Sequence, residues 1–276
     1  MPILVAVGIV FPVVFVLFVA GFLRRWRLWQ VGQPVKRTDR WFARLMTTIA
    51  VAIPHVSFFR KGELYPSFMH IFILGGTALL FLGKIVRLLS FGGLSMPPQS
   101  VYLYASLVSE IGGVVILIGG AMAVYRRYVR RPDRLDTKDD DTLVYVWAFV
   151  IVLTGFMVKG YRIATSAVPP PDWASWSPVG YLISRAFLVF GGSMKNEILV
   201  WHRVIIHTLP AVFLLGYMWV TRSRLQHIVI SPLNVFFRSL KPTGELVPID
   251  LEKAETFGNS LVEQFTWKQL LDLDAC

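Results

Sequence analysis

Long apolar runs are the feature that most limits how this chain can fold. Each of five runs is about 20 residues long, which is the helix length needed to cross the roughly 30 Å hydrocarbon core of a membrane. Backbone groups inside hydrocarbon must satisfy their own hydrogen bonds, so such runs fold as helices. We therefore predict an all-α integral membrane protein with five transmembrane helices in a bundle. The expected spans are 3–23, 67–89, 101–125, 142–162 and 197–221.

Composition agrees with a membrane protein and argues against a nucleic-acid partner. Of the 276 residues, 55% are hydrophobic and 16% are charged, whereas soluble domains carry about 25% charged residues. The net charge of +11 could suit a nucleic acid. However, the lysines and arginines gather at the ends of the apolar runs, where membrane topology explains them. We expect contact with lipid and no nucleic-acid partner.

Basic clusters predict the direction of the spans. They follow the first, third and fifth apolar runs, at 24–27, 126–131 and 222–224. These three ends must share one side of the membrane, and the positive-inside rule makes that side cytoplasmic. The amino terminus is then outside and the carboxyl terminus inside. We expect a multi-pass protein of a prokaryotic-type cytoplasmic (inner) membrane.

Shorter segments complete the predicted layout. Segment 43–60 is apolar but too short for a sixth span, and it is expected to form an interfacial helix. Segment 163–196, rich in proline and tryptophan, is expected to be an external loop on the membrane surface. The acidic run 139–141 suits the amino terminus of the fourth span. We predict a membrane domain over 1–235 and a cytoplasmic linker over 236–276.

Two histidines are the strongest candidates for a cofactor site. His70 and His227 lie near the predicted inner boundary of different spans. A histidine at the edge of hydrocarbon is costly unless it has a partner, and two imidazoles at matching depth can bind one haem iron. Gly75 and Gly76 follow His70 and would let a flat macrocycle approach the backbone. The alternative is a helix-packing histidine followed by glycines for close helix contact.

The sequence does not decide whether the chain binds a second haem in the outer half of the membrane. His207 lies 20 residues before His227, about 30 Å away along a continuous helix, and is the candidate iron ligand at that depth. The outer half of the first four spans holds no histidine to pair with it, so Met157, a lysine or an open position would be needed. The candidate cations for haem propionates are Lys84, Lys159 and Arg162 on the outer side, and Arg222 and Arg224 on the inner side. Their alternative role is snorkelling at the membrane interface.

Two of these segments resemble known haem-binding helices. The runs 70–75 (HIFILG) and 224–232 (RLQHIVISP) are similar to the two haem-ligand helices of the gamma subunit of respiratory nitrate reductase. The nearer resemblance is to the cytochrome b domains of heterodisulfide-reductase-related iron–sulfur oxidoreductases. This resemblance implies that His70 and His227 bind an inner haem b. The family's outer ligand on the last span falls two residues from His207, and its partner would fall at Leu80, which cannot bind iron.

The end of the sequence resembles the entry to a ferredoxin-like domain in the same oxidoreductases. The resemblance covers 263–276, and it implies that Cys276 is the first ligand of a [4Fe–4S] cluster in a longer protein. A free cysteine is the alternative.

Together these features predict a haem b membrane subunit for electron transfer. It would exchange electrons between a pool of menaquinone or ubiquinone and cytoplasmic iron–sulfur centres, as the quinone-reactive part of an oxidoreductase complex. The alternative is a non-redox membrane anchor or an ion or proton transporter. Transporters more often show internal repeats and midplane acidic residues, whereas this sequence shows no repeat and has Glu110 as its one carboxylate well inside a span.

Overall fold

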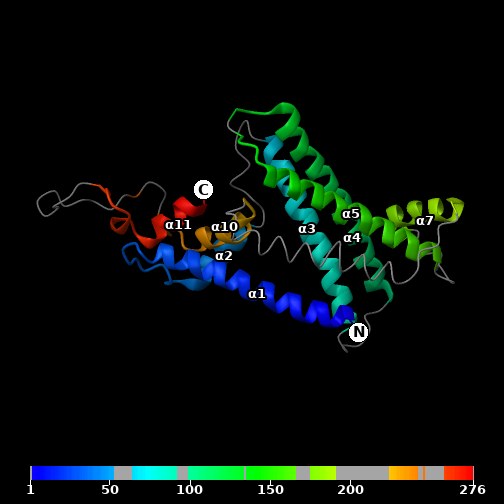
Figure 1. Cartoon of the computed structure of the whole chain (residues 1–276), viewed down its shortest axis with the longest axis horizontal. Helices are drawn as coiled ribbons and strands as arrows, with labels where there is room; N and C mark the ends of the chain where they lie inside the picture. The colour runs from blue at the N-terminus through cyan, green and yellow to red at the C-terminus, as the bar shows by residue number, and fades with distance from the viewer. Residues whose placement is uncertain are drawn as a thin grey trace, which may run out of the picture. The chain divides into compact units, whose positions relative to one another are not determined.

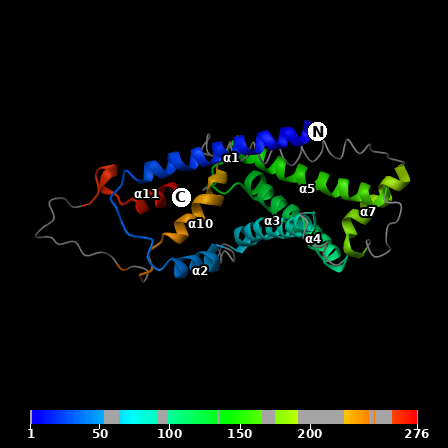
Figure 2. The same ribbon diagram turned by 90° about the horizontal axis from the view of Figure 1, so that it is seen from below.

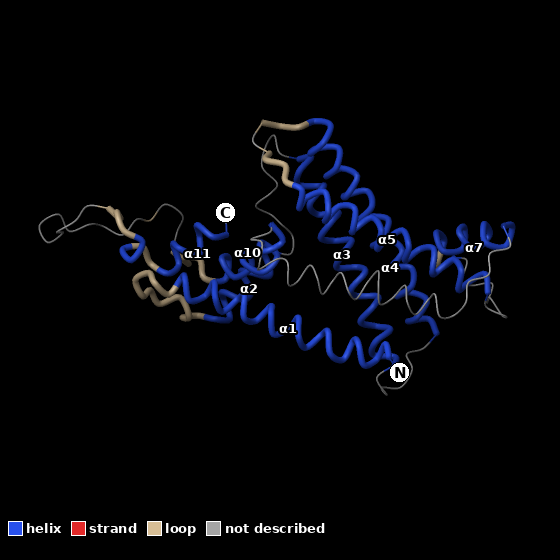
Figure 3. The backbone as a smooth tube through the Cα atoms, viewed as in Figure 1, coloured by secondary structure: helices blue, strands red, loops and turns tan. Residues whose placement is uncertain are grey.

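The regular structure of the chain is helical. All regular elements in the described part are helices, apart from an isolated parallel bridge between Gln33 and Thr266 (Figure 3). The chain divides into two compact units, one of Met1–Ser57 with Thr208–Cys276 and one of Phe58–His207. The computed structural model describes residues 2–52, 64–91, 99–133, 135–165, 175–190, 224–241, 245 and 258–275.

The second unit is built on long helices. α3 (Leu64–Phe91) packs along α4 (Gln99–Val124), and α5 (Asp139–Thr165) contacts both α4 and the shorter α7 (Pro178–Phe190) (Figure 1). Its core consists of Ile116, Val152 and Phe156.

Three helices confirm the second, third and fourth predicted spans as helices of membrane length. Leu64–Val86, Ser100–Arg130 and Asp141–Thr165 are long and apolar enough to cross a membrane. Only 11%, 28% and 17% of their apolar windows are buried inside the protein. Bare apolar surface of this extent is typical of helices that face lipid. The helical class of the prediction is thus confirmed, and its membrane character is supported.

Other parts of the predicted layout stay predictions. The helix α1 (Pro2–Trp29) extends over the first predicted span, whereas the fifth, 197–221, lies outside the described residues. The number of five spans, their direction and the boundary between 1–235 and 236–276 are not tested by the fold.

Glycines bring α3 and α4 into backbone contact. A Cβ atom at Gly76 would lie 2.7 Å from the carbonyl oxygen of Gly112, and one at Gly112 would lie 2.8 Å from the carbonyl oxygen of Gly76. Gly119 is equally close to Ile73 further along the same seam. Small residues allow this approach, which is a usual device for packing helices in membranes.

An ion pair joins the ends of α4 and α5. After α4 the chain makes a π-helical turn, Tyr125–Arg130, which ends at Arg131 with a left-handed φ of 44°. Arg127 of this turn lies 2.5 Å from the Asp141 carboxylate, and the same carboxylate accepts the Lys138 backbone N–H at 3.0 Å. Asp141 therefore holds the turn between the helices, besides its predicted role at a helix amino terminus.

The first unit combines the long helix α1 with shorter helices. α10 (His227–Phe236) contacts both α2 (Trp41–Ala52) and α11 (Trp267–Ala275), and α11 also contacts α1 (Figure 2). The predicted interfacial segment 43–60 is helical as far as Ala52, and its remainder lies outside the described residues. The core of this unit consists of Trp29, Ile230, Trp267 and Leu271.

The expectation of an external loop over 163–196 is wrong in part. α5 continues to Thr165, and α7 occupies Pro178–Phe190. Proline suits the first position of a helix, because its missing N–H is not needed there. Ile183 packs against the core of the unit. The prolines of this segment favoured a loop in the sequence, whereas Pro178 is the first residue of a helix.

The close contact of α3 and α4 predicts that an alanine at Gly76 costs more stability than an alanine at Gly155. Gly76→Ala forces the two backbones apart and should destabilise the unit by about 1–3 kcal/mol, which is the range for overpacking. On α5, a Cβ atom at Gly155 would meet none of the described residues within 4 Å, so Gly155→Ala should not destabilise the unit. Thermal unfolding in detergent, followed by circular dichroism, measures both. Equal loss of stability in the two variants would contradict the close contact.

Candidate functional site

His70 lies on a side of α3 that α4 does not cover. The residues of α3 that meet α4 include Ile73, Gly76 and Gly83. An α-helix turns by about 100° per residue, so His70 lies about 100° around the α3 axis from the residues that meet α4. Leu74 and Phe81 lie on the same stripe of α3 as His70. His70 is half-buried, whereas Leu74 and Phe81 are exposed in the described part of the unit. The imidazole therefore sits beside a surface that α4 leaves open.

The two glycines after His70 differ in their surroundings. Gly76 faces α4 in the tight contact described above, so its small size serves helix packing. Among the described residues, none lies within 4 Å of a Cβ atom built at Gly75. Open space at Gly75 is compatible with the predicted approach of a macrocycle, and that role stays a prediction for both glycines.

His227 is the first residue of α10. It is exposed and follows a 3₁₀ turn, Arg224–Gln226. Gln226 is buried, and its side-chain oxygen accepts a hydrogen bond from Arg25 of α1 at 3.3 Å. His70 and His227 belong to different compact units, so their sharing of one iron stays a prediction.

Several predicted site residues fall outside the described part of the chain. These residues are His207, Arg222 and Cys276. Arg224 is described only through its backbone. Within the described residues, no group of three or more His, Cys, Asp and Glu side chains could hold a metal. A haem iron bound by two histidines would not need such a group.

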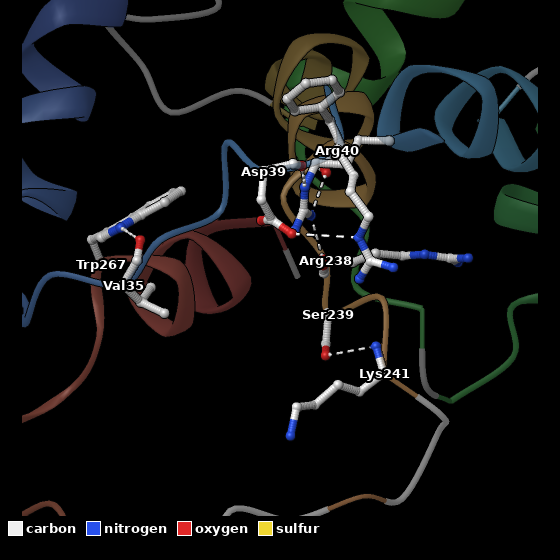
Figure 4. A network of polar contacts seen from close by, with 9 residues as sticks. Val35, Asp39, Arg40, Arg238, Ser239, Lys241 and Trp267 are labelled. Atoms are coloured by element: carbon white, nitrogen blue, oxygen red, sulfur yellow. Dashed lines mark hydrogen bonds and ion pairs between the residues drawn. The ribbon is translucent and has the colours of Figure 1, made fainter. Parts of the chain in front are cut away.

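Residues 258–275, called the tail below, pack against the end of α1 and the turn that follows it. Backbone hydrogen bonds run from Gln33 to Phe265 at 2.7 Å and from Trp267 to Gln33 at 3.0 Å. The Trp267 indole donates to the Val35 carbonyl at 2.9 Å, as Figure 4 shows. At Gly32 a Cβ atom would lie 2.6 Å from the Phe265 carbonyl oxygen. Glycine is therefore needed where the tail crosses this turn.

The helix that ends this tail has a strong start and a buried face. Thr266 and Gln269 form a capping box, in which the Thr266 hydroxyl accepts the Gln269 N–H at 3.2 Å and the Gln269 side chain accepts the Thr266 N–H at 2.8 Å. Leu271 is fully buried and packs with Trp29 and Ile230. The tail is thus part of the folded unit.

Arg25 ties the end of α11 to the start of α10. It lies 2.5 Å from the Asp274 carboxylate, and the other oxygen of that carboxylate accepts the Trp29 indole N–H at 3.0 Å. The same guanidinium donates to Gln226, the residue before His227. A single side chain thus connects the helix start that carries one predicted iron ligand to the helix end that precedes Cys276.

Arg44 of α2 holds the opposite end of α10. Its side chain is 2% exposed and donates to the carbonyl oxygens of Phe236 at 3.2 Å and Arg238 at 2.7 Å. Cations favour a helix carboxyl terminus, where carbonyl groups lack helical partners. The guanidinium also binds Asp39 at 2.8 Å, and this hydrogen bond holds the pKa of the Asp39 carboxyl below its usual value. Figure 4 shows Asp39 and Arg238 in this network.

A second polar cluster lies among α4, α5 and α7. The Glu110 carboxylate, 2% exposed, lies 2.9 Å from the Lys159 ammonium and accepts the backbone N–H groups of Val179 at 2.8 Å and Gly180 at 3.0 Å. Lys159 also donates to the Ser106 carbonyl at 3.2 Å. Glu110 therefore caps α7 from a neighbouring helix. The sequence pointed to Glu110 and Lys159 separately, and it indicated neither their ion pair nor the contact of Glu110 with α7.

Two further cations were predicted to lie on the outer side of the membrane. Lys84 on α3 and Arg162 on α5 are exposed in the described structure. Their predicted contacts with haem propionates stay predictions.

Comparison with known proteins finds two similar oxidoreductases. The chain is 32% identical over 270 residues to the EtfAB:quinone oxidoreductase of Syntrophomonas wolfei. The aligned region covers 94% of this chain and 37% of that protein. It is 30% identical over 216 residues to the probable iron-sulfur-binding oxidoreductase FadF of Bacillus subtilis. This aligned region covers 75% of the chain and 29% of that protein. No protein-family model and no solved structure matches.

These similarities confirm the coarser part of the sequence-based expectation. The chain is related to oxidoreductases whose names refer to a quinone and to iron–sulfur binding. It spans roughly a third of the length of these relatives. The finer resemblance to a cytochrome b and to the nitrate reductase gamma subunit, and with it the haem, stays a prediction.

The docked tail predicts different effects at two neighbouring leucines. Leu271→Ala removes a fully buried side chain and should destabilise the unit by about 2–5 kcal/mol. Leu273 is 66% exposed, so Leu273→Ala should have little effect. Limited proteolysis should release the tail of the first variant faster than that of the second. Equal protection of both tails would contradict docking.

The Asp39–Arg44 contact predicts a pH-dependent contribution to stability. Because the folded pKa of Asp39 lies below its usual value of 3.8, the contribution is complete above that value and is lost as the pH falls through the lowered pKa. The stability advantage of the wild type over Asp39→Asn should therefore be constant near neutral pH and shrink in acid. Denaturant unfolding at a series of pH values measures it. An advantage that grows in acid would refute the contact.

Proposed function

From the similarity to two oxidoreductases, we propose that the chain is the haem b membrane part of a larger oxidoreductase. It exchanges electrons between a membrane quinone, either menaquinone or ubiquinone, and cytoplasmic iron–sulfur centres. The name of one relative refers to a quinone and that of the other to iron–sulfur binding. The proposal includes five spans, an outer amino terminus and a prokaryotic-type cytoplasmic membrane.

The observation that carries the proposal is the link made by Arg25. Its guanidinium contacts both Asp274, two residues before Cys276, and Gln226, one residue before His227. If His227 binds haem iron and Cys276 begins a [4Fe–4S] site, the two redox groups are attached to one folded unit. A fixed separation would let electrons pass between them without movement of a domain.

The surroundings of the two histidines fit a haem held between helices. His70 lies on a stripe of α3 that α4 leaves uncovered, and no described residue lies within 4 Å of a Cβ atom built at Gly75. His227 is exposed at the start of α10. When bound, haem supplies one-electron chemistry, and two imidazoles favour electron transfer over oxygen binding. The chain's role is to bind and orient the group and to exclude water.

The cations proposed for the propionates differ in their surroundings. Lys159 is paired with Glu110, so its charge is already balanced. Arg222 and Arg224 lie close to His227 in sequence and are the stronger candidates for the inner haem. Lys84 and Arg162 are the outer candidates. A second haem bound through His207 would need a further ligand from another part of the complex or an open coordination position.

One observation favours a second candidate function, an ion or proton transporter. The Glu110–Lys159 pair lies within predicted spans, and intramembrane ionisable residues often mark such pathways. However, both carboxylate oxygens of Glu110 accept backbone N–H groups of α7, which fits a structural anchor better than a mobile proton site.

Absorption spectroscopy tests the proposed haem. The protein expressed with ample haem should show a Soret band of low-spin b-type haem. His70→Ala and His227→Ala should each abolish the low-spin spectrum, because each removes one axial ligand. A quinol should reduce the haem of the wild type.

His55→Ala is the matched control, since His55 falls within 43–60, the segment that the sequence predicts to be interfacial, and is not a predicted iron ligand. Its low-spin spectrum should be unchanged. Absence of a Soret band in the haem-replete wild type would reject the cytochrome proposal and leave the anchor or transporter.

A further inference from the structure

We propose that the start of α2 binds the headgroup of an anionic phospholipid. The site lies within the first unit, where α2 packs against α10. Its cations are Arg40, the residue before α2, and Arg238, which follows the end of α10. The apolar side chains along α2 contact the acyl chains of the same lipid layer. The inference goes beyond the proposed electron transfer and depends on neither haem nor quinone.

One face of α2 is apolar and exposed. Its large side chains are between 38% and 63% exposed, and they are Trp41, Phe42, Leu45, Met46 and Ile49. At about 100° per residue these positions share one side of the helix. Arg44 lies on the opposite side, is 2% exposed, and is the one charged residue within α2. A short helix with such a face is typical of a membrane surface.

The order of side chains along α2 matches the layers of a lipid leaflet. The cation Arg40 stands before the helix, and the aromatic residues Trp41 and Phe42 open it. Aliphatic side chains follow over 45–49. Cations gather at lipid phosphates, aromatic rings gather just below them, and aliphatic groups prefer the hydrocarbon. A protein partner would not call for this order, so the exposed face fits lipid better than protein.

Arg44 brings the two exposed arginines together. Its backbone N–H donates to the Arg40 carbonyl oxygen at 3.1 Å, and its guanidinium donates to the Arg238 carbonyl oxygen at 2.7 Å. The backbones of Arg40 and Arg238 are therefore held by one buried residue, and both appear in the network of Figure 4. Arg44 is thus a positioning residue for the proposed site.

Positive charge exceeds negative charge at this place. Asp39 is the one carboxylate in the sequence of 36–49 and 231–241. Its nearer partner is Arg44, at 2.8 Å, whereas the Arg40 guanidinium lies 3.6 Å away. One carboxylate therefore faces several guanidinium groups, and an anion would improve the balance of charge.

A phospholipid phosphate suits the two exposed arginines. The Arg40 side chain is 66% exposed, and Arg238 is also exposed. Guanidinium groups bind phosphate oxygens through paired hydrogen bonds. Under the predicted topology, the chain between the first and second spans lies on the cytoplasmic side, where anionic lipids give the membrane surface a negative potential.

Quenching by brominated lipids tests the site in the full chain. Cys276→Ser removes the single cysteine, and Ala43→Cys places a bimane label at an exposed position of α2. The protein is reconstituted in phosphatidylcholine bilayers. Phosphatidylglycerol with brominated acyl chains should quench the label more strongly than the same fraction of brominated phosphatidylcholine, because the anionic lipid is enriched at α2.

Removal of the arginines should abolish this preference. Arg40→Gln and Arg238→Gln should each lower the relative affinity for phosphatidylglycerol about fivefold, since each removes one cation near the surface. Arg40→Lys and Arg238→Lys keep the charge and should keep part of the preference. Arg185→Gln is the matched control, because it removes an exposed arginine of α7 in the other unit and should leave the preference unchanged. Thermal unfolding shows that each variant is folded.

Four results would overturn the proposal. Without quenching by either lipid, the exposed face of α2 is covered by something other than lipid. Equal quenching by both lipids means that α2 meets lipid but selects no headgroup. A preference that survives both glutamine variants places the anionic lipid elsewhere, and one that glycerol phosphate removes reveals a site for soluble phosphate. The haem spectrum is not involved in any of these results, so the proposed function is tested separately.

Discussion

Helix ends in this protein are held by buried charges from neighbouring helices, and the positions of its polar sites depend on this interaction. Glu110 binds the free amide groups at the start of α7, and Arg44 binds the carbonyl groups at the end of α10. In both places the side chain has the sign that the helix dipole favours. Water is scarce around such apolar helices, so these groups need partners within the protein.

The sequence predicted the helices better than it predicted the polar contacts. The apolar runs marked α3, α4 and α5 because span length and hydropathy are local properties. The partner of Glu110 could not be found in this way, because it is the backbone of α7, about 70 residues further on. The role of Gly76 depended on where α4 lies, which no local pattern specifies. Arg25 looked like one member of a basic cluster, yet it joins two distant segments.

The polar clusters around Arg25 and Lys159 have different places in the proposed electron path. The cluster around Arg25 belongs to the side of the protein that leads to Cys276, where electrons would pass between haem and iron–sulfur centres. The cluster around Lys159 belongs to the predicted spans. The Arg25 guanidinium is held by the side chains of Asp274 and Gln226, whereas the Glu110 carboxylate is held by backbone N–H groups of α7.

The docking of α11 also bears on how a partner domain could move. Many electron carriers swing on a flexible tether, so their rate depends on how often the domain finds its target. Here the last described helix is fixed by a capping box, a buried leucine and an ion pair. A domain attached through α11 would start from an immobile stalk, and the distance for electron tunnelling would be set by the fold and not by diffusion.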